Sequence, residues 1–261
     1  MACGGGESVP APPGSMACAT GALGSGAADA TFALAAWPDR DYDLVVPPSH
    51  VCGQPIGVVV ALHGGGSNKE GMRRLACPDG DLASPRCLHR VAAAAGLAMA
   101  HRLACQAPDL VAAVAPVSGQ NQSALAGCAP SQRVAVLDIH GTLDACWPYA
   151  GGNGGCLESG LYVSVDETLA GWAARNACAP APMATTMAPI AGVQDGTSVV
   201  RRDHGGCAAG GALAHLEVVG NGHFWPGGHP YASGTILGGV MSRQLDTGQA
   251  VIDFFAAHAR P

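Results

Sequence analysis

The 261-residue chain has few charged and few aromatic side chains, and its hydrophobic residues do not gather into long runs. Charged residues make up 12% of the sequence and aromatic residues 5%, and 13 basic against 19 acidic side chains give a formal net charge of -6. A nucleic-acid-binding protein needs a basic face for the phosphates, so this balance argues against such a partner. No stretch of about 18 or more apolar residues occurs, so we expect no transmembrane segment.

Paired C-x-x-C motifs are also absent, although the chain contains 11 cysteines. Structural zinc sites favour such pairs, so the scattered cysteines indicate disulfides and a secreted or extracytoplasmic location. The alternative is that they are reduced and packed as small apolar residues. Because the count is odd, at least one cysteine is unpaired or modified. Cys3 is the candidate, since "MACGGGES" is similar to the start of a mature bacterial lipoprotein, and we expect a lipid anchor there.

Glycine, alanine, serine and proline dominate residues 1–36, which are predicted to form a flexible leader. Residues 37–261 alternate apolar runs with amphipathic patterns and are predicted to form one domain. Strands are expected over 41–47, 56–66, 110–119, 133–144 and 212–223. Helices are expected over 87–96, 98–108, 165–178 and 246–259. This alternation indicates an α/β domain with a mostly parallel sheet flanked by helices.

Three polar groups follow predicted strands, where the carboxyl ends of an α/β sheet gather the chemistry. They are the loop His63-Gly64-Gly65-Gly66-Ser67-Asn68, Asp144 and His223. Singly, each has an ordinary explanation as a tight turn, a helix cap or a loop histidine. Together they occur in the chain order that an α/β-hydrolase requires: a loop of free N–H groups for an oxyanion, an acid and a base.

At these residues the chain resembles the secreted polyhydroxybutyrate depolymerase-like and feruloyl esterases of the α/β-hydrolase superfamily. The resemblance covers roughly residues 40–261, and its specific parts are "HGTLD…PY" and "GNGHFWPGG". It implies that Asp144 is the triad acid, that His223 is the general base and that Gly65 donates a main-chain N–H to the oxyanion hole. It also suggests Trp147 and Trp225 as walls for the substrate, with packing inside a loop as the alternative for each.

The same resemblance shows what is missing between Gly96 and the helix "AMAHRLAC". Members of the family carry there a strand, a loop, a helix and a second strand that runs into a nucleophile elbow similar to "GLSNGAMMAHRLAC". Here "AAAAG" passes directly into "LAMAHRLAC". We therefore expect an α/β-hydrolase-like sheet without these strands and helix. Either the remaining strands pair with one another or apolar edges stay exposed.

No other residue replaces the missing serine in the sequence. Neither Ser25, Ser67 nor Ser118 stands in a G-x-S-x-G motif, and Ser67 belongs to the loop that would supply the oxyanion donors. Cys105 lies beyond the missing elbow and is expected to face the packing side or a disulfide. The sequence thus holds two of the three triad members, and we expect hydrolysis to be severely reduced or absent.

Proximity along the chain and the family likeness together suggest three disulfides, each stabilising by about 2 to 4 kcal/mol if unstrained. The expected pairs are Cys77 with Cys87, Cys146 with Cys156, and Cys178 with Cys207.

Our interpretation is a serine-type carboxylic ester hydrolase that acts on a polyester or plant cell-wall ester and needs no metal or other cofactor. Two alternatives remain. One is a polymer- or carbohydrate-binding protein that has lost the nucleophile. The other is a metal site built from Asp138, His140, His204, His215, His223 and His229, although no H-E-x-x-H pair supports it.

Overall fold

A computed structural model describes residues 30–34, 37–44, 58–64, 67, 71–72, 97–122, 128, 131–156, 160–229 and 237–260. The chain divides into two compact units, Met1–Ile56 and Gly57–Pro261. In the first unit, β1 (Ala30–Leu34) and β2 (Trp37–Leu44) pair antiparallel. Strand β1 thus lies inside the range expected to be a flexible leader, and β2 does not join the main sheet.

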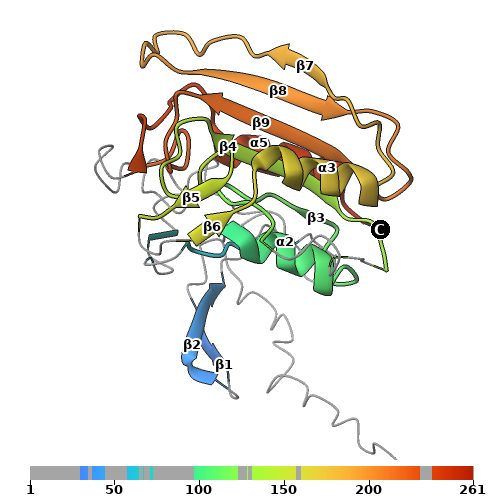
Figure 1. Cartoon of the computed structure of the whole chain (residues 1–261). Coiled ribbons are helices and arrows are strands. Elements are labelled where there is room, and N and C mark those ends of the chain that lie inside the picture. The colour runs from blue at the N-terminus through green and yellow to red at the C-terminus, as the bar shows by residue number, and fades with distance from the viewer. Residues whose placement is uncertain are drawn as a thin grey trace, which may run out of the picture. The chain divides into compact units, whose positions relative to one another are not determined.

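The second unit contains the sheet and the helices around it (Figure 1). Its helices are α2 (Leu97–Gln106), α3 (Val165–Arg175) and α5 (Thr247–Ala257). Its strands are β3 (Ala113–Val114), β4 (Ala135–Gly141), β5 (Gly152–Gly154), β6 (Gly160–Tyr162), β7 (Met183–Thr186), β8 (Ser198–His204) and β9 (Leu213–Val219).

Five of these strands form one mixed sheet in the order β3-β4-β9-β8-β7. Strands β3, β4 and β9 are parallel, whereas β8 and β7 each run antiparallel to their neighbour. The α/β class is confirmed, but the expectation of a mostly parallel sheet is wrong for this part of the chain. The connections over 187–197 and 205–212 are too short for the helical crossover that parallel neighbours need.

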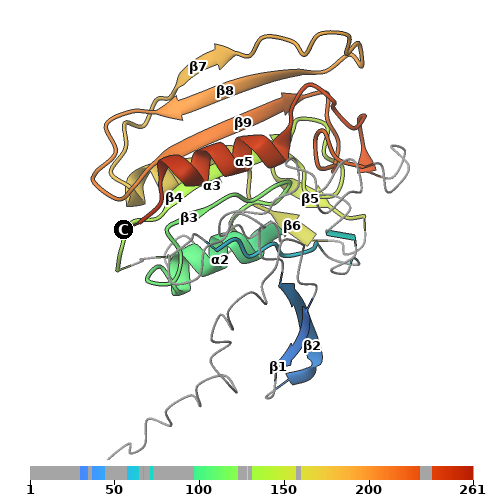
Figure 2. The same ribbon diagram turned by 180° about the vertical axis from the view of Figure 1, so that it is seen from behind.

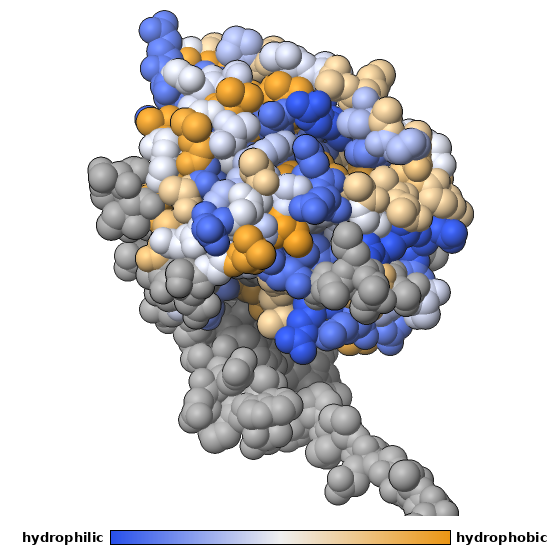
Figure 3. Space-filling view, in the orientation of Figure 1, coloured by the Kyte–Doolittle hydropathy of each residue, from blue (hydrophilic) through white to orange (hydrophobic). Residues whose placement is uncertain are grey.

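Helices cover both faces of the sheet, and Figures 1 and 2 view these faces in turn: α3 lies in front in the first view and α5 in the second. Strand β4 is buried along its whole length because its alternate side chains enter two different cores. Leu137 and Ile139 pack with α5, and Val136 packs with α2 and α3. On the surface seen in Figure 3, apolar residues form several small groups among hydrophilic ones.

Helices α3 and α5 begin at residues that satisfy free main-chain N–H groups. Ser164 and Glu167 form a reciprocal capping box at the start of α3, and Asp246 accepts the Gln249 N–H at the start of α5. Among the described residues, no helix combines the length and hydropathy that crossing a bilayer would require.

The strand expected over 56–66 is not formed in the part of it that the structure describes, residues 58–64. Val59 and Leu62 pack against the two cores, but Val58 is 62% exposed and Val60 49% exposed. An apolar run forms a buried strand only where neighbouring strands take up its main-chain hydrogen bonds. The prediction rested on the run alone, which does not show whether neighbouring strands will pair with it.

Candidate active site

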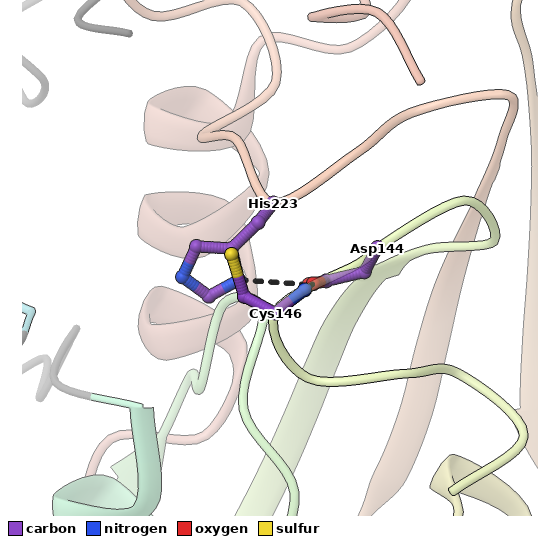
Figure 4. Close-up of side chains that lie close together, drawn as sticks. All are labelled: Asp144, Cys146 and His223. Atoms are coloured by element: carbon purple, nitrogen blue, oxygen red, sulfur yellow. Dashed lines mark hydrogen bonds and ion pairs between the residues drawn. The ribbon is translucent and has the colours of Figure 1, made fainter. Parts of the chain in front are cut away.

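The carboxyl ends of β4 and β9 bring Asp144 and His223 together (Figure 4). These strands are parallel neighbours, and Gly141 at the end of β4 is in register with Val218 of β9. Loops that follow the two strands therefore start side by side. Although 79 residues apart in the sequence, Asp144 Oδ2 and His223 Nδ1 lie 2.9 Å apart.

The carboxylate of Asp144 is buried and held by donors on both of its oxygens. The main-chain N–H groups of Cys146 and Trp147 each donate to Oδ1 at 2.8 Å. Oδ2 lies 2.9 Å from His223 Nδ1 and 3.3 Å from His140 Nε2. Burial disfavours the charged form, but the hydrogen bonds and positive charge of the two histidines outweigh it and lower the pKa of Asp144. The site therefore holds a carboxylate in a fixed orientation.

His223 is placed by a loop that packs closely against its neighbours. Its main-chain N–H donates to Leu237 O at 2.8 Å, and its side chain is 18% exposed. The preceding Gly222 is obligatory, because a Cβ there would lie 1.6 Å from Gly238 O. A neutral ring that donates to Asp144 Oδ2 carries its hydrogen on Nδ1.

An apolar cluster packs the loop of Asp144 against the loop of His223. Cys146, Phe224 and Leu237 form its buried part, and Trp147 and Cys156 lie at its margin. The disulfide between Cys146 and Cys156 closes a ten-residue segment beside the site. Both loops are thus tied together by packing as well as by the contact between the acid and the base.

The two tryptophans suggested as substrate walls occupy different environments. Trp147 is partly buried, and its ring centroid lies 4.6 Å from that of Tyr162 on β6. It therefore stays a candidate wall for the substrate. Trp225 is only 6% exposed and belongs to the core that packs against α5. Its burial favours the packing alternative over contact with a substrate.

The structure contains the expected pair Cys178–Cys207 and also the pair Cys105–Cys128. The latter fits the expectation that Cys105 faces packing or a disulfide rather than a substrate. The other expected pair, Cys77 with Cys87, lies outside the described residues. The same holds for the expected lipid anchor, Cys3, and for the expected oxyanion donor, Gly65.

Of the three serines considered as replacements for the nucleophile, the structure describes Ser67 and Ser118. Ser67 is exposed, and its main-chain N–H donates to Gly64 O at 3.2 Å. Ser118 is 5% exposed, has a φ of 55° and donates its hydroxyl to Phe224 O at 3.3 Å. This bond ties the end of β3 to the loop of His223, which indicates a structural use for Ser118.

The metal alternative gains no support from the described residues. In this part of the chain, the potential ligand atoms of one group, Asp144, Cys146 and His223, lie within 4.8 Å of one another. The Cys146 sulfur is in a disulfide, so it is not available as a ligand. His204 pairs with Leu213, at the opposite end of β9 from this group.

Sequence reasoning offered Asp138, His140 and His215 only as part of a metal site and did not predict the buried polar cluster that they form beneath Asp144 and His223. Asp138, His140, His215 and His101 are each at most 1% exposed, and the first three lie on neighbouring strands. His140 reaches Asp144 directly. The available signal was the alternation of Asp138 and His140 within an apolar strand, which places both side chains on one face.

Comparison with known proteins gives one informative relative. The chain is 32% identical over 177 residues to a protein named "Putative esterase NocK" from Nocardia uniformis subsp. tsuyamanensis. The alignment covers 60% of this chain and 47% of the relative, so the chain spans about half the length of that protein. No protein-family model matches the chain. These similarities support ester hydrolysis at a coarse level.

Proposed function

We propose that the chain carries the acid–base half of a serine-type carboxylic ester hydrolase, with Asp144 as the acid and His223 as the general base. The observation that supports this most directly is the 2.9 Å contact between Asp144 Oδ2 and His223 Nδ1 at the ends of adjacent parallel strands. In such a pair the carboxylate orients the imidazole and stabilises the imidazolium that forms when Nε2 takes a proton. Similarity to a named esterase supports the same reaction class.

The substrate class is proposed from the resemblance of the "HGTLD" and "GNGHFWPGG" motifs to polyester and feruloyl esterases. Trp147, beside the loop of Asp144, is the candidate wall for an acyl or aromatic group, and Gly65 is the proposed oxyanion donor. The described disulfides are compatible with an extracytoplasmic location.

Activity of this chain is expected to be very low because its sequence contains no G-x-S-x-G nucleophile. Loss of the nucleophile from a triad costs about a factor of a million in turnover, while binding and oxyanion stabilisation leave about a thousandfold or more over water. The measurement is hydrolysis of p-nitrophenyl butyrate, with labelling by a fluorophosphonate in parallel. We expect neither labelling nor turnover near that of an ordinary esterase.

His223→Ala is expected to leave the remaining hydrolysis within about tenfold of the wild type, because triad members act as a unit and only binding and oxyanion stabilisation remain once the nucleophile is missing. His204→Gln is the matched control, since His204 lies at the opposite end of the sheet. A much larger loss in His223→Ala alone would show that His223 still activates a nucleophile in this chain, which would contradict the predicted impairment. Labelling together with turnover within about tenfold of an active esterase would contradict the predicted impairment.

A binding protein that retains the site without turnover is the second candidate, favoured by the missing nucleophile motif. It predicts that the chain binds polyhydroxybutyrate granules or feruloylated arabinoxylan in a sedimentation assay without releasing acid. Release of ester products during the same assay would support the hydrolase instead.

A further inference from the structure

The α3-facing side of the sheet contains ionisable side chains where apolar ones are expected. Asp138 and His140 of β4, His215 of β9 and His101 of α2 are all almost fully buried. Buried charges and imidazoles are costly unless they are paired, so the contacts of each group constrain its role. Asp144, the proposed acid, lies in the loop that follows β4.

Two of these histidines have their partners below the site. His215 Nδ1 lies 2.8 Å from Asp138 Oδ2, and the Tyr149 hydroxyl lies 2.9 Å from His215 Nε2. His101 Nδ1 accepts the Trp172 indole N–H at 3.0 Å, so its Nε2 carries the hydrogen and donates to Gly119 O at 3.1 Å. Burial lowers the pKa of His101 despite the charge of Asp138, which keeps this ring neutral.

His140 differs because its contacts lead to the candidate acid. Its Nε2 lies 2.9 Å from Trp147 O and 3.3 Å from Asp144 Oδ2. Both partners are acceptors, so Nε2 carries a hydrogen that they share. The ring therefore connects the carboxylate to the main chain of the same loop.

We propose that His140 is a positioning residue that fixes Asp144 Oδ2 from inside the sheet, so that the carboxylate keeps its orientation toward His223. With the two main-chain donors on Oδ1, the carboxylate then has four partners, about as many as its lone pairs can accept. The inference rests on the proposed acid–base roles of Asp144 and His223. It adds a residue that neither contacts substrate nor moves the reacting proton.

Titratable and charged groups surround His140 from several packed elements. They are Asp138 and Asp144 from β4 and its loop, His215 and Glu217 from β9, His101 from α2, and Tyr149 and His223 from the flanking loops. Burial alone would lower the pKa of His140, but its bond to Asp144 and the charges of Asp144 and Asp138 raise it overall.

The directions of these pKa shifts define the pH range in which the contact between His140 and Asp144 stabilises the fold. A raised pKa in His140 contributes stability that is complete below its unfolded value of about 6.5 and is lost as pH rises through the folded value. A lowered pKa in Asp144 contributes stability above about 3.8 that is lost as pH falls through the folded value. The coupling between the two residues is therefore largest between about pH 4 and pH 6.5.

The first test follows the ring nitrogens of His223 by two-dimensional NMR that correlates them with the ring protons. His140→Gln retains a side-chain N–H donor without the positive charge, whereas His140→Leu removes both. We expect His223 to keep its hydrogen on Nδ1 in the wild type and in His140→Gln, and to populate both tautomers in His140→Leu. His204→Gln is the control, because it removes another buried histidine far from the site.

A tautomer of His223 that is identical in all folded variants would overturn the proposal, since a merely structural role leaves it unchanged. If His140→Leu does not fold, a double-mutant cycle of His140→Gln with Asp144→Asn decides. We expect coupling of about tenfold in the unfolding equilibrium near pH 5.5, where the contact between the two side chains contributes fully. Unfolding free energies that are additive at this pH would contradict the contact between His140 and Asp144.

Neither readout depends on turnover. A chain that hydrolyses no ester therefore still tests this inference, and a negative NMR and coupling result leaves the proposed ester hydrolysis to its own assay.

Discussion

Strands β4 and β9 and the segment 58–64 all contain apolar runs, but only the two strands pair within the sheet. Beyond β4 and β9, two loops are joined by the Asp144–His223 contact, an apolar cluster and a disulfide. Segment 58–64, which leads into the proposed oxyanion loop, forms no strand and exposes Val58 and Val60. The difference teaches that an apolar run becomes a buried strand only where neighbouring strands take up its main-chain hydrogen bonds.

Amide hydrogen exchange provides the largest contrast between these regions. Amides of β4 are expected to exchange only through extensive unfolding, because the strand is buried and paired on both edges. Amides of 58–64 are expected to exchange at least about a thousandfold faster, since no strand pairing protects them. Mass spectrometry or NMR measures both in one sample. Comparable protection in the two segments would show that 58–64 is a true strand of the sheet.

Matched truncations of apolar side chains sharpen the same comparison. Leu137→Ala removes a fully buried side chain of β4 and is expected to lower the free energy of unfolding by about 2 to 5 kcal/mol. Val60→Ala removes a side chain that is 49% exposed and is expected to cost less than about 1 kcal/mol. Urea unfolding measures both. Equal losses would mean that residues 58–64 are buried in solution.

How far the sequence alone predicts this fold depends on the surroundings of each segment. Strands β4 and β9 and helices α3 and α5 were predicted because their apolar patterns match their final burial. Strands β7 and β8 were missed because β7 is exposed throughout and β8 is only partly buried, so neither produces a long apolar run. Residues 56–66 produce such a run, but the run itself does not show whether other strands will pair with it.

The candidate site shows the same division between local and distant information. The proximity of Asp144 and His223 could be predicted, since each follows an apolar strand and parallel strands end at one edge. The role of His140 could not, because a histidine within an apolar strand gives no sign of which residue it will face. Its contact with Asp144 depends on how the loop after β4 turns back, and that turn is held by residues from another strand.

The smallest expected contrast concerns glycines and tests whether the two loops must approach as closely as they do. Gly222→Ala places a Cβ 1.6 Å from Gly238 O, so the main chain has to shift, at a cost of about 1 to 3 kcal/mol in unfolding free energy. Gly205→Ala is the control, because a Cβ there meets no atom within 4 Å. Thermal or urea unfolding compares them. Because Gly222 precedes His223, Gly222→Ala is also expected to disturb the contact between His223 and Asp144, whereas Gly205→Ala leaves that contact intact. Equal stability of the two variants would show that the loops have room to separate.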